Sequence, residues 1–341
     1  MPRPWKTIRE SVNRRKVATV LKAVFVRLML LGHSVLGAWR VVETLADDRY
    51  WLLTVPCGCL LTETLYSVTR HGGLERKWFS LCFLFYLLGI LPAIWILELN
   101  LINNYSAVQK STEQTTGHDV NTTANTAAVI REELFDISSH PWVVIIQESL
   151  VYLLVFGRWF LPRGEVSRTA LSDLLIRYLG MASDIMGIFA LFDEKEVRVR
   201  SGLTYAVLTI WSLSFVQFVP VLVSAQSYTS PSNKWITRNC GEHFVEVVVT
   251  CLALCLQDGP FLILRLYIML HIQLVTYSIL FFVIKNIVVI LLIVYKLSIL
   301  CLQLPGCYEE KGTLVKVINV DIDNHVTHST SSVHDPAHFY I

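Results

Sequence analysis

Charged side chains are scarce in this sequence. Asp, Glu, Lys and Arg make up 16% of its 341 residues, whereas soluble globular proteins average about a quarter. Hydrophobic residues account for 53%, and the mean hydropathy is +0.51. This composition excludes a soluble globular domain and indicates an integral membrane protein, with the lipid bilayer as its main surrounding.

The usual signatures of enzymes and of nucleic-acid binding are also missing. The chain has no His-Glu-x-x-His zinc motif, no phosphate-binding glycine loop and no nucleophile elbow. The net charge is only +2, and no basic face with aromatic platforms lies outside the apolar segments. We therefore expect a protein that is not an enzyme, that holds no metal or other cofactor and that binds no nucleic acid.

Long apolar runs fill most of the chain. A helix needs about 20 mostly apolar residues to cross a bilayer, because no water is present there to satisfy an open backbone. Eight segments meet or approach this length: 22–42, 50–69, 78–98, 142–161, 171–191, 203–223, 243–268 and 273–296. The sequence therefore predicts an all-α fold, a polytopic membrane helical bundle with eight transmembrane helices. This domain covers residues 22–300, between a basic N-terminal segment at 1–21 and a C-terminal tail at 301–341.

The fifth segment, 171–191, has the weakest transmembrane character. Asp173, Arg177 and Asp184 follow one another at spacings of four and seven, which places them on one stripe of a helix. Such a helix could lie on the membrane surface instead of crossing it, and every later segment would then invert. We expect the segment to cross.

Two independent signals predict the orientation. Lys and Arg are more frequent in the segments that would be cytoplasmic if the N-terminus lies inside. Both Asn-x-Ser/Thr sequons, which begin at Asn104 and Asn121, fall in the loop 99–141, which this orientation places outside. We predict glycosylation at both asparagines, a mobile polar loop over 103–128 and cytoplasmic N- and C-termini. Only the basic stretch 193–200, assigned outside, argues against this orientation.

The C-terminal tail is a candidate for binding protein partners. Its alternating stretch KVINVDIDNHV permits a strand that could become ordered on contact with another protein. The last three residues, 339–341, have the form of one class of PDZ ligand, which adds a strand to a sheet edge. A tripeptide of this form also recurs often by chance.

Ionisable side chains inside the apolar runs are the best markers of a site, because each costs roughly 2.5–3.5 kcal/mol to insert. In a short antiparallel hairpin, residues equally far from the turn lie at equal depth. Reflection of Lys285 through the turn near 271–272 leads to Asp258, which we predict as its partner. Pro260 removes an amide donor and should kink or open the helix at that depth. Asp184, in the fifth segment, competes with Asp258 for Lys285.

Three further polar residues complete this candidate intramembrane site. Asn286 follows Lys285, while Glu246 and Gln257 lie on one face of the seventh segment. Together these groups could line a small polar cavity beside a broken helix, an arrangement typical of ion and solute sites. They could equally form an ion pair and interhelical hydrogen bonds that fix the packing.

A second candidate ion pair lies in the first hairpin. Reflection of Glu63 through the turn near Ala46 leads close to Arg27. His33 lies one to two turns deeper on the same helix, and we interpret it as a core histidine with satisfied hydrogen bonds.

Several blocks of this sequence resemble one family of multi-pass membrane proteins, the transmembrane protein 26 family. In order along the chain they are HSVLGAWRVVE, DRYWLL, KWFSLCFLFYLLGILPAIWILEL, GRWFLP, LSDLLIRYLGMASDI, QDGPFLILRL and IKNIVVILL. The resemblance covers about residues 15–300 and departs from the family in the basic N-terminus and in the tail. It implies an eight-span helical architecture. It implies no activity, ligand or catalytic residue, so no site is transferred from it.

Two functions follow from these observations. The first is a membrane scaffold, receptor-like component or partner-binding protein without catalytic activity. The alternative is a transporter or channel for a small solute or ion, in which Asp258, Lys285, Asn286 and Asp184 surround the broken seventh helix.

Overall fold

The computed structural model describes residues 4–75, 79–115, 122–161, 168–198, 200–220 and 246–302. Within these residues the elements are helical, apart from one isolated β-bridge between Phe79 and Pro220. The chain is thus an all-α bundle with several membrane-length helices, as the hydropathy pattern predicts.

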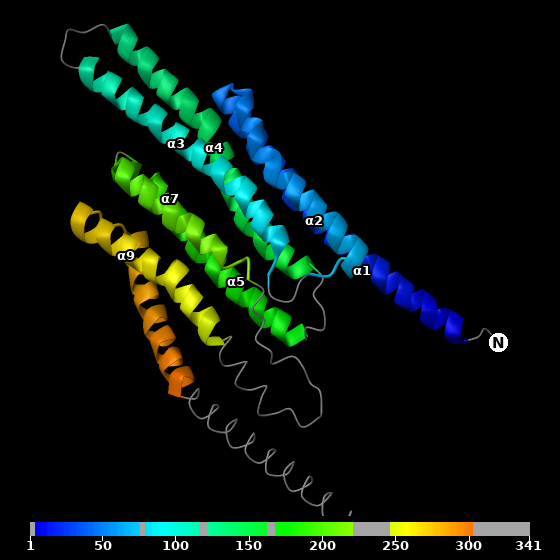
Figure 1. The fold of residues 1–341 in the computed structure, drawn as a ribbon. Helices are drawn as coiled ribbons and strands as arrows, with labels where there is room; N and C mark the ends of the chain where they lie inside the picture. The colour runs from blue at the N-terminus through cyan, green and yellow to red at the C-terminus, as the bar shows by residue number, and fades with distance from the viewer. Residues whose placement is uncertain are drawn as a thin grey trace, which may run out of the picture.

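The first four long helices form one group, coloured blue to green in Figure 1. They are α1 (Pro4–Leu45), α2 (Val55–His71), α3 (Leu81–Thr115) and α4 (Thr122–Phe160). A short 3-10 helix, η1 (Asp48–Thr54), joins α1 to α2, with Asp47 capping its first turn through Arg49 N–H at 2.9 Å. Both α1 and α3 pack against the other three long helices of the group.

The remaining helices continue the bundle, with α5 packed against α4 and α7 packed against α3. They are α5 (Arg168–Phe189), the 3-10 helix η2 (Ala190–Asp193), α6 (Lys195–Arg198) and α7 (Ser201–Val216). Two long helices follow, Glu246–Ile272 and Tyr277–Leu302. In Figure 1 the last of these is the orange helix next to α9.

Seven of the eight predicted spans correspond to helices long and apolar enough to cross a bilayer. Among them is the fifth segment, found at Leu174–Phe192, which packs against α4 and α7 as part of the bundle. The exception is the sixth segment, which corresponds to the 16-residue helix α7. Pro220 explains the early end of α7, because a proline disfavours helical geometry in the residue before it. The carbonyl of Val219 instead accepts a backbone hydrogen bond from Ser80 N–H at 2.9 Å.

The polar loop predicted over 103–128 differs in the structure. Helix α3 continues to Thr115 and α4 begins at Thr122, so most of this stretch is helical. The physical reason is propagation: extending an existing helix costs far less than nucleating a new one. Residues 105–115 of α3 and 122–140 of α4 also contain no glycine and no proline, the two residues that disfavour a helix most.

Two glycines show how closely the helices pack. A Cβ on Gly157 of α4 would lie 2.9 Å from the ring of Phe83 on α3. A Cβ on Gly187 of α5 would lie 2.5 Å from the ring of Phe282 on the last helix. Both contacts are possible only because glycine lacks a side chain. The second contact fixes which face of the last helix meets α5.

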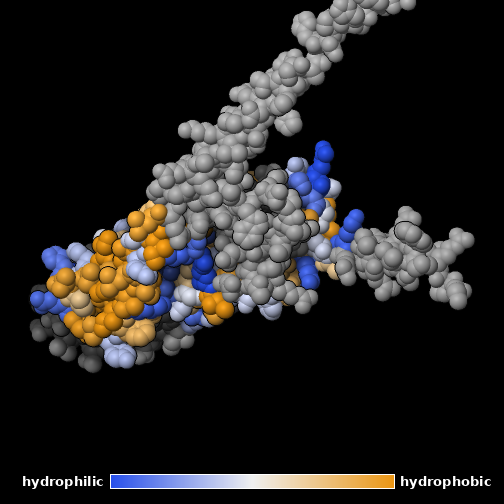
Figure 2. Space-filling view, turned by 90° about the horizontal axis from the view of Figure 1, so that it is seen from below, coloured by the Kyte–Doolittle hydropathy of each residue, from blue (hydrophilic) through white to orange (hydrophobic). Residues whose placement is uncertain are grey.

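Apolar side chains cover much of the outer surface. On the last helix, Tyr277, Leu291, Tyr295 and Leu302 are each more than half exposed. The space-filling view in Figure 2 shows hydrophobic residues gathered in a patch on the described surface. A face of this composition suits contact with lipid.

Candidate functional site

The seventh helix changes its hydrogen-bond pattern just before Pro260, the position where the sequence predicts a kink or an opening. Within Glu246–Ile272, a π-helical turn, η3 (Leu254–Asp258), precedes α9 (Gly259–Tyr267), and a second π-turn, η4 (Ile268–Ile272), follows it. Pro260 lies in the first turn of α9, where its missing amide donor is tolerated. Gly259 N–H donates to the carbonyl of Leu254, and a Cβ on Gly259 would lie 2.7 Å from that oxygen. π-turns of this kind often mark functional positions.

Lys285 is paired with Asp184 and not with Asp258. The lysine Nζ donates to Asp184 Oδ1 on α5 and forms a salt bridge there. The contact of Phe282 with Gly187 explains this choice, because Lys285 and Asp184 each lie three residues from that contact on antiparallel helices. Reflection about a turn gives the depth of a residue, but the face it points to is set by the packing.

Asp258 lies in the same cluster. Its side chain is buried, and it is close enough to Asp184 and Lys285 to interact with both charges. The two carboxylates and the lysine therefore form one group of charges at the π-turn, where α5 and the last two helices meet.

The other three predicted polar residues differ in their surroundings. Gln257 accepts a hydrogen bond from Gln217, the residue that follows α7, and donates to the carbonyl of Met181 on α5 at 3.4 Å, so it connects three segments. Asn286 is buried, and neither atom of its amide finds a hydrogen-bond partner in the part of the chain that is described. Glu246 instead pairs with Lys296 at 2.7 Å. This pair lies more than three helical turns, or roughly 18 Å, along the helix from Asp258.

Arg265 is a buried charge that the sequence analysis overlooked. It lies on α9 with 0% of its surface exposed, and its guanidinium carbon is 4.3 Å from the centre of the Phe282 ring. Among the described residues, none of its three guanidinium nitrogens has a hydrogen-bond partner. The signal was present in the sequence, since this arginine interrupts the apolar run FLILRLY in the same way that Lys285 interrupts its own run.

Arg27 and Glu63 are in contact, and they join α1 to α2. Arg27 Nε lies 3.0 Å from Glu63 Oε2, and Arg27 Nη2 lies 3.1 Å from Glu63 Oε1, which makes the pair bidentate. Ser67 adds an acceptor 3.0 Å from Nη2. His33 has two partners: Ser149 Oγ at 2.7 Å and the hydroxyl of Tyr86 at 2.8 Å. These bonds fix α1 against α2, α3 and α4.

A third buried arginine joins distant segments at one end of the bundle. Arg158 of α4 is fully buried, and its guanidinium carbon lies 4.4 Å from the centre of the Phe83 ring. It donates to the carbonyl of Phe218, just beyond α7, and its Nη1 lies 3.4 Å from Glu75 Oε2. Charged groups with this many internal partners stabilise the packing of the helices.

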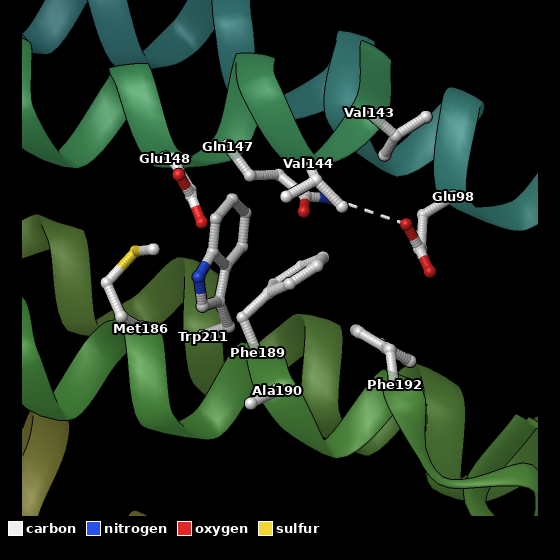
Figure 3. Close-up of a pocket in the computed structure, with 10 residues that line it drawn as sticks. All are labelled: Glu98, Val143, Val144, Gln147, Glu148, Met186, Phe189, Ala190, Phe192 and Trp211. Atoms are coloured by element: carbon white, nitrogen blue, oxygen red, sulfur yellow. Dashed lines mark hydrogen bonds between the residues drawn. The ribbon is translucent and has the colours of Figure 1, made fainter. Parts of the chain in front are cut away.

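A small cavity lies between α3, α4, α5 and α7 (Figure 3). Its volume is ≈ 110 Å³. The residues that line it are Glu98, Val143, Val144, Gln147, Glu148, Met186, Phe189, Ala190, Phe192 and Trp211. None of these residues belongs to the predicted intramembrane site.

The side-chain amide of Gln147 lies on the polar side of this cavity. Gln147 Nε2 donates to Glu98 Oε2 at 3.3 Å, and both side chains are buried. The other amide atom, Gln147 Oε1, has no hydrogen-bond partner in the described residues, and Figure 3 shows it turned toward the cavity. Over the described ranges, no group of three or more His, Cys, Asp or Glu residues is placed to hold a metal ion.

The comparison with known families gives one match. The family described as Transmembrane protein 26 matches residues 17–296. The match covers most of the chain, which therefore belongs to this family, as its sequence blocks indicate. No solved structure matches the chain.

Proposed function

We propose that this member of the transmembrane protein 26 family is a non-enzymatic, receptor-like membrane protein that binds a protein partner through the helical hairpin of α3 and α4. One observation carries the proposal: these two helices are longer than a bilayer requires. The candidate spans are Leu81–Asn104 and Pro141–Phe160, yet α3 runs on to Thr115 and α4 starts at Thr122.

The extensions form a projecting structure. At 1.5 Å per residue, α3 continues for roughly 16 Å beyond its span and α4 for roughly 28 Å. Figure 1 shows the two helices side by side, reaching past the ends of the other helices. A helical hairpin that leaves the membrane offers surface to a partner in the aqueous phase.

The charges inside the bundle support a structural role for the intramembrane polar site. Lys285 is engaged with Asp184, and Arg27 with Glu63. Ion pairs formed within the protein hold helices together, whereas a carrier site must offer its charges to a solute. This argument favours a receptor or scaffold over a transporter.

The hairpin test uses two deletions in the full-length protein. In one variant a short glycine linker replaces residues 105–140, which joins helices that already lie side by side. We expect this variant to keep its thermal unfolding temperature and its membrane insertion, and to lose the species formed on intact cells with a membrane-impermeant crosslinker. The control variant lacks residues 303–341 and should keep those species. Unchanged crosslinking after deletion of the hairpin would refute this function.

The proposed orientation places the hairpin outside the cell or in the lumen, with both termini in the cytoplasm. Asn104 lies at the end of the α3 span, and Asn121 lies outside the described residues. The changes Asn104→Gln and Asn121→Gln should each remove one glycosidase-sensitive step in gel mobility. If neither change alters the mobility, the hairpin does not lie on the glycosylated side.

A transporter remains a second candidate because of Arg265. This fully buried guanidinium lies between two π-turns and has no hydrogen-bond partner in the described chain. It could therefore receive the negative charge of a passing anion. Flux of a small anion into liposomes, present with the protein and lost with Arg265→Met while the variant unfolds at the same temperature, would favour transport. Absence of flux with the intact protein would exclude this candidate for the anions tested.

A further inference from the structure

The cavity of Figure 3 lies where the membrane part of the molecule meets the hairpin. Glu98 is close to the end of the α3 span, and Gln147 is close to the start of the α4 span. The opposite wall comes from Phe189 at the end of α5 and from Trp211 on α7. The site is thus built from four helices, and it is separate from the charged cluster around Lys285.

The oxygen atoms of Glu98, Gln147 and Glu148 give the wall formed by α3 and α4 several hydrogen-bond acceptors. Gln147 Nε2 is used by Glu98, and this bond leaves the amide oxygen turned into the cavity without a donor in the described chain. A buried acceptor without a partner costs about 1–3 kcal/mol, so a ligand that brings an N–H group is favoured there. Glu148, on the next position of α4, also points to the cavity in Figure 3 and is exposed at its rim.

Its apolar wall presents aromatic rings. Trp211 and Phe189 lie next to each other, with ring centroids 5.2 Å apart, and Figure 3 shows both below Gln147. The negative face of an aromatic ring attracts a cation, and tryptophan does so most strongly. The carboxylate of Glu148 adds negative charge on the opposite side.

The volume limits the size of the ligand. A single water needs about 10–15 Å³ of cavity, whereas this cavity measures ≈ 110 Å³. It therefore admits a molecule of several heavy atoms. A ligand that matches the wall has a positive charge, at least one N–H donor and a short apolar part.

We propose that this cavity is a binding site for a small primary ammonium ion, with Gln147 Oε1 and Glu148 accepting its N–H groups and Trp211 and Phe189 contacting its apolar part. The site does not depend on the partner-binding function of the hairpin, so failure of one proposal would not refute the other. A quaternary ammonium has no N–H group for Gln147 and should bind more weakly than a primary one.

The test is a binding titration on the full-length protein in lipid nanodiscs. Propylammonium is the probe, and propanol, tetramethylammonium and sodium are the comparison solutes. We expect propylammonium to bind, propanol to show no saturable binding, tetramethylammonium to bind at least several-fold more weakly and sodium not to compete. Equal binding of propylammonium and propanol, or displacement of propylammonium by sodium at similar concentration, would overturn the proposal.

Three variants locate the site. Glu148→Gln removes a charge from an exposed side chain and should weaken propylammonium binding about tenfold, the loss expected for one charge-assisted hydrogen bond. Gln147→Met keeps the length of the side chain, removes the acceptor and should weaken binding to a similar extent. Asp48→Asn removes an exposed carboxylate on η1, outside the cavity, and should leave the affinity unchanged.

The exposed position of Glu148 makes Glu148→Gln informative even if the Gln147 variant does not fold. If Gln147→Met fails to fold, Glu148→Gln still reports on the site, because an exposed side chain contributes little to packing. An affinity that is the same in Glu148→Gln, Asp48→Asn and the unmodified protein would place the ligand elsewhere and refute the proposal.

Discussion

Replacement of Arg27 by Met should destabilise the bundle by about 3–5 kcal/mol, the range found when one partner of a buried ion pair is removed. The side chain of Arg27 is 1% exposed and that of Glu63 is 14% exposed, so the carboxylate left behind would have little access to water. The variant also loses the bidentate contact and the bond to Ser67 Oγ. Because Glu63 keeps some exposure, we expect a value near 3 kcal/mol.

The assay is equilibrium unfolding of the protein in mixed micelles, followed as a double-mutant cycle. Arg27→Met combined with Glu63→Met removes both charges and should recover most of the loss, since an apolar pair of similar size substitutes well for a buried ion pair. Glu43→Gln is the matched control: it breaks the Arg40–Glu43 pair, in which Glu43 is 48% exposed, and should cost less than about 1 kcal/mol. If the double variant is as unstable as Arg27→Met, or if Arg27→Met costs no more than Glu43→Gln, the pair does not hold α1 against α2.

Three further predictions follow from the second half of the molecule. Lys285→Met should lower the unfolding temperature by leaving Asp184 unpaired, and adding Asp184→Leu should restore it; a double variant no better than the single one contradicts the pair. Gly187→Ala should destabilise, because its Cβ would lie 2.5 Å from an aromatic ring, whereas Gly180→Ala on the same helix meets nothing within 4 Å and should be neutral or slightly stabilising. Arg265→Met should leave the unfolding temperature unchanged or raise it, since the buried guanidinium lacks hydrogen-bond partners in the described residues and a methionine can keep the contact with the Phe282 ring; a clear loss would contradict this account.

The fold was predictable because the bilayer imposes a simple rule. A span must be long, apolar and internally hydrogen-bonded, and hydropathy measures the first two properties directly. The exception is α7, where Pro220 and the backbone contact of Val219 with Ser80 end the helix early. Hydropathy averages over a window and does not register such a local bond.

The candidate ion pairs show the limit of arguments from depth. Arg27 and Glu63 flank a short connection, so equal depth was enough to bring them together. Lys285 had two carboxylates at suitable depth, and the choice between Asp184 and Asp258 depended on which face of the last helix meets α5. That face is set by the fit of Phe282 against Gly187, a contact between residues almost 100 positions apart.

The cavity could not be predicted from the sequence, for the same reason. Glu98, Gln147 and Trp211 come from three helices, and no spacing along the chain relates them. Only the packing of α3, α4 and α7 brings an amide oxygen, two carboxylates and aromatic rings to one point.

The sequence by itself determined the membrane setting, the helical class, most of the spans and the position of the helical irregularity before Pro260, because each of these depends on residues that are neighbours along the chain. The tertiary structure alone decided the partner of Lys285, the packing of Arg265 against Phe282 without a hydrogen-bond partner in the described residues, and the existence of the cavity. These features depend on how helices turn and approach one another, which is a property of side-chain fit between distant segments and not of local pattern.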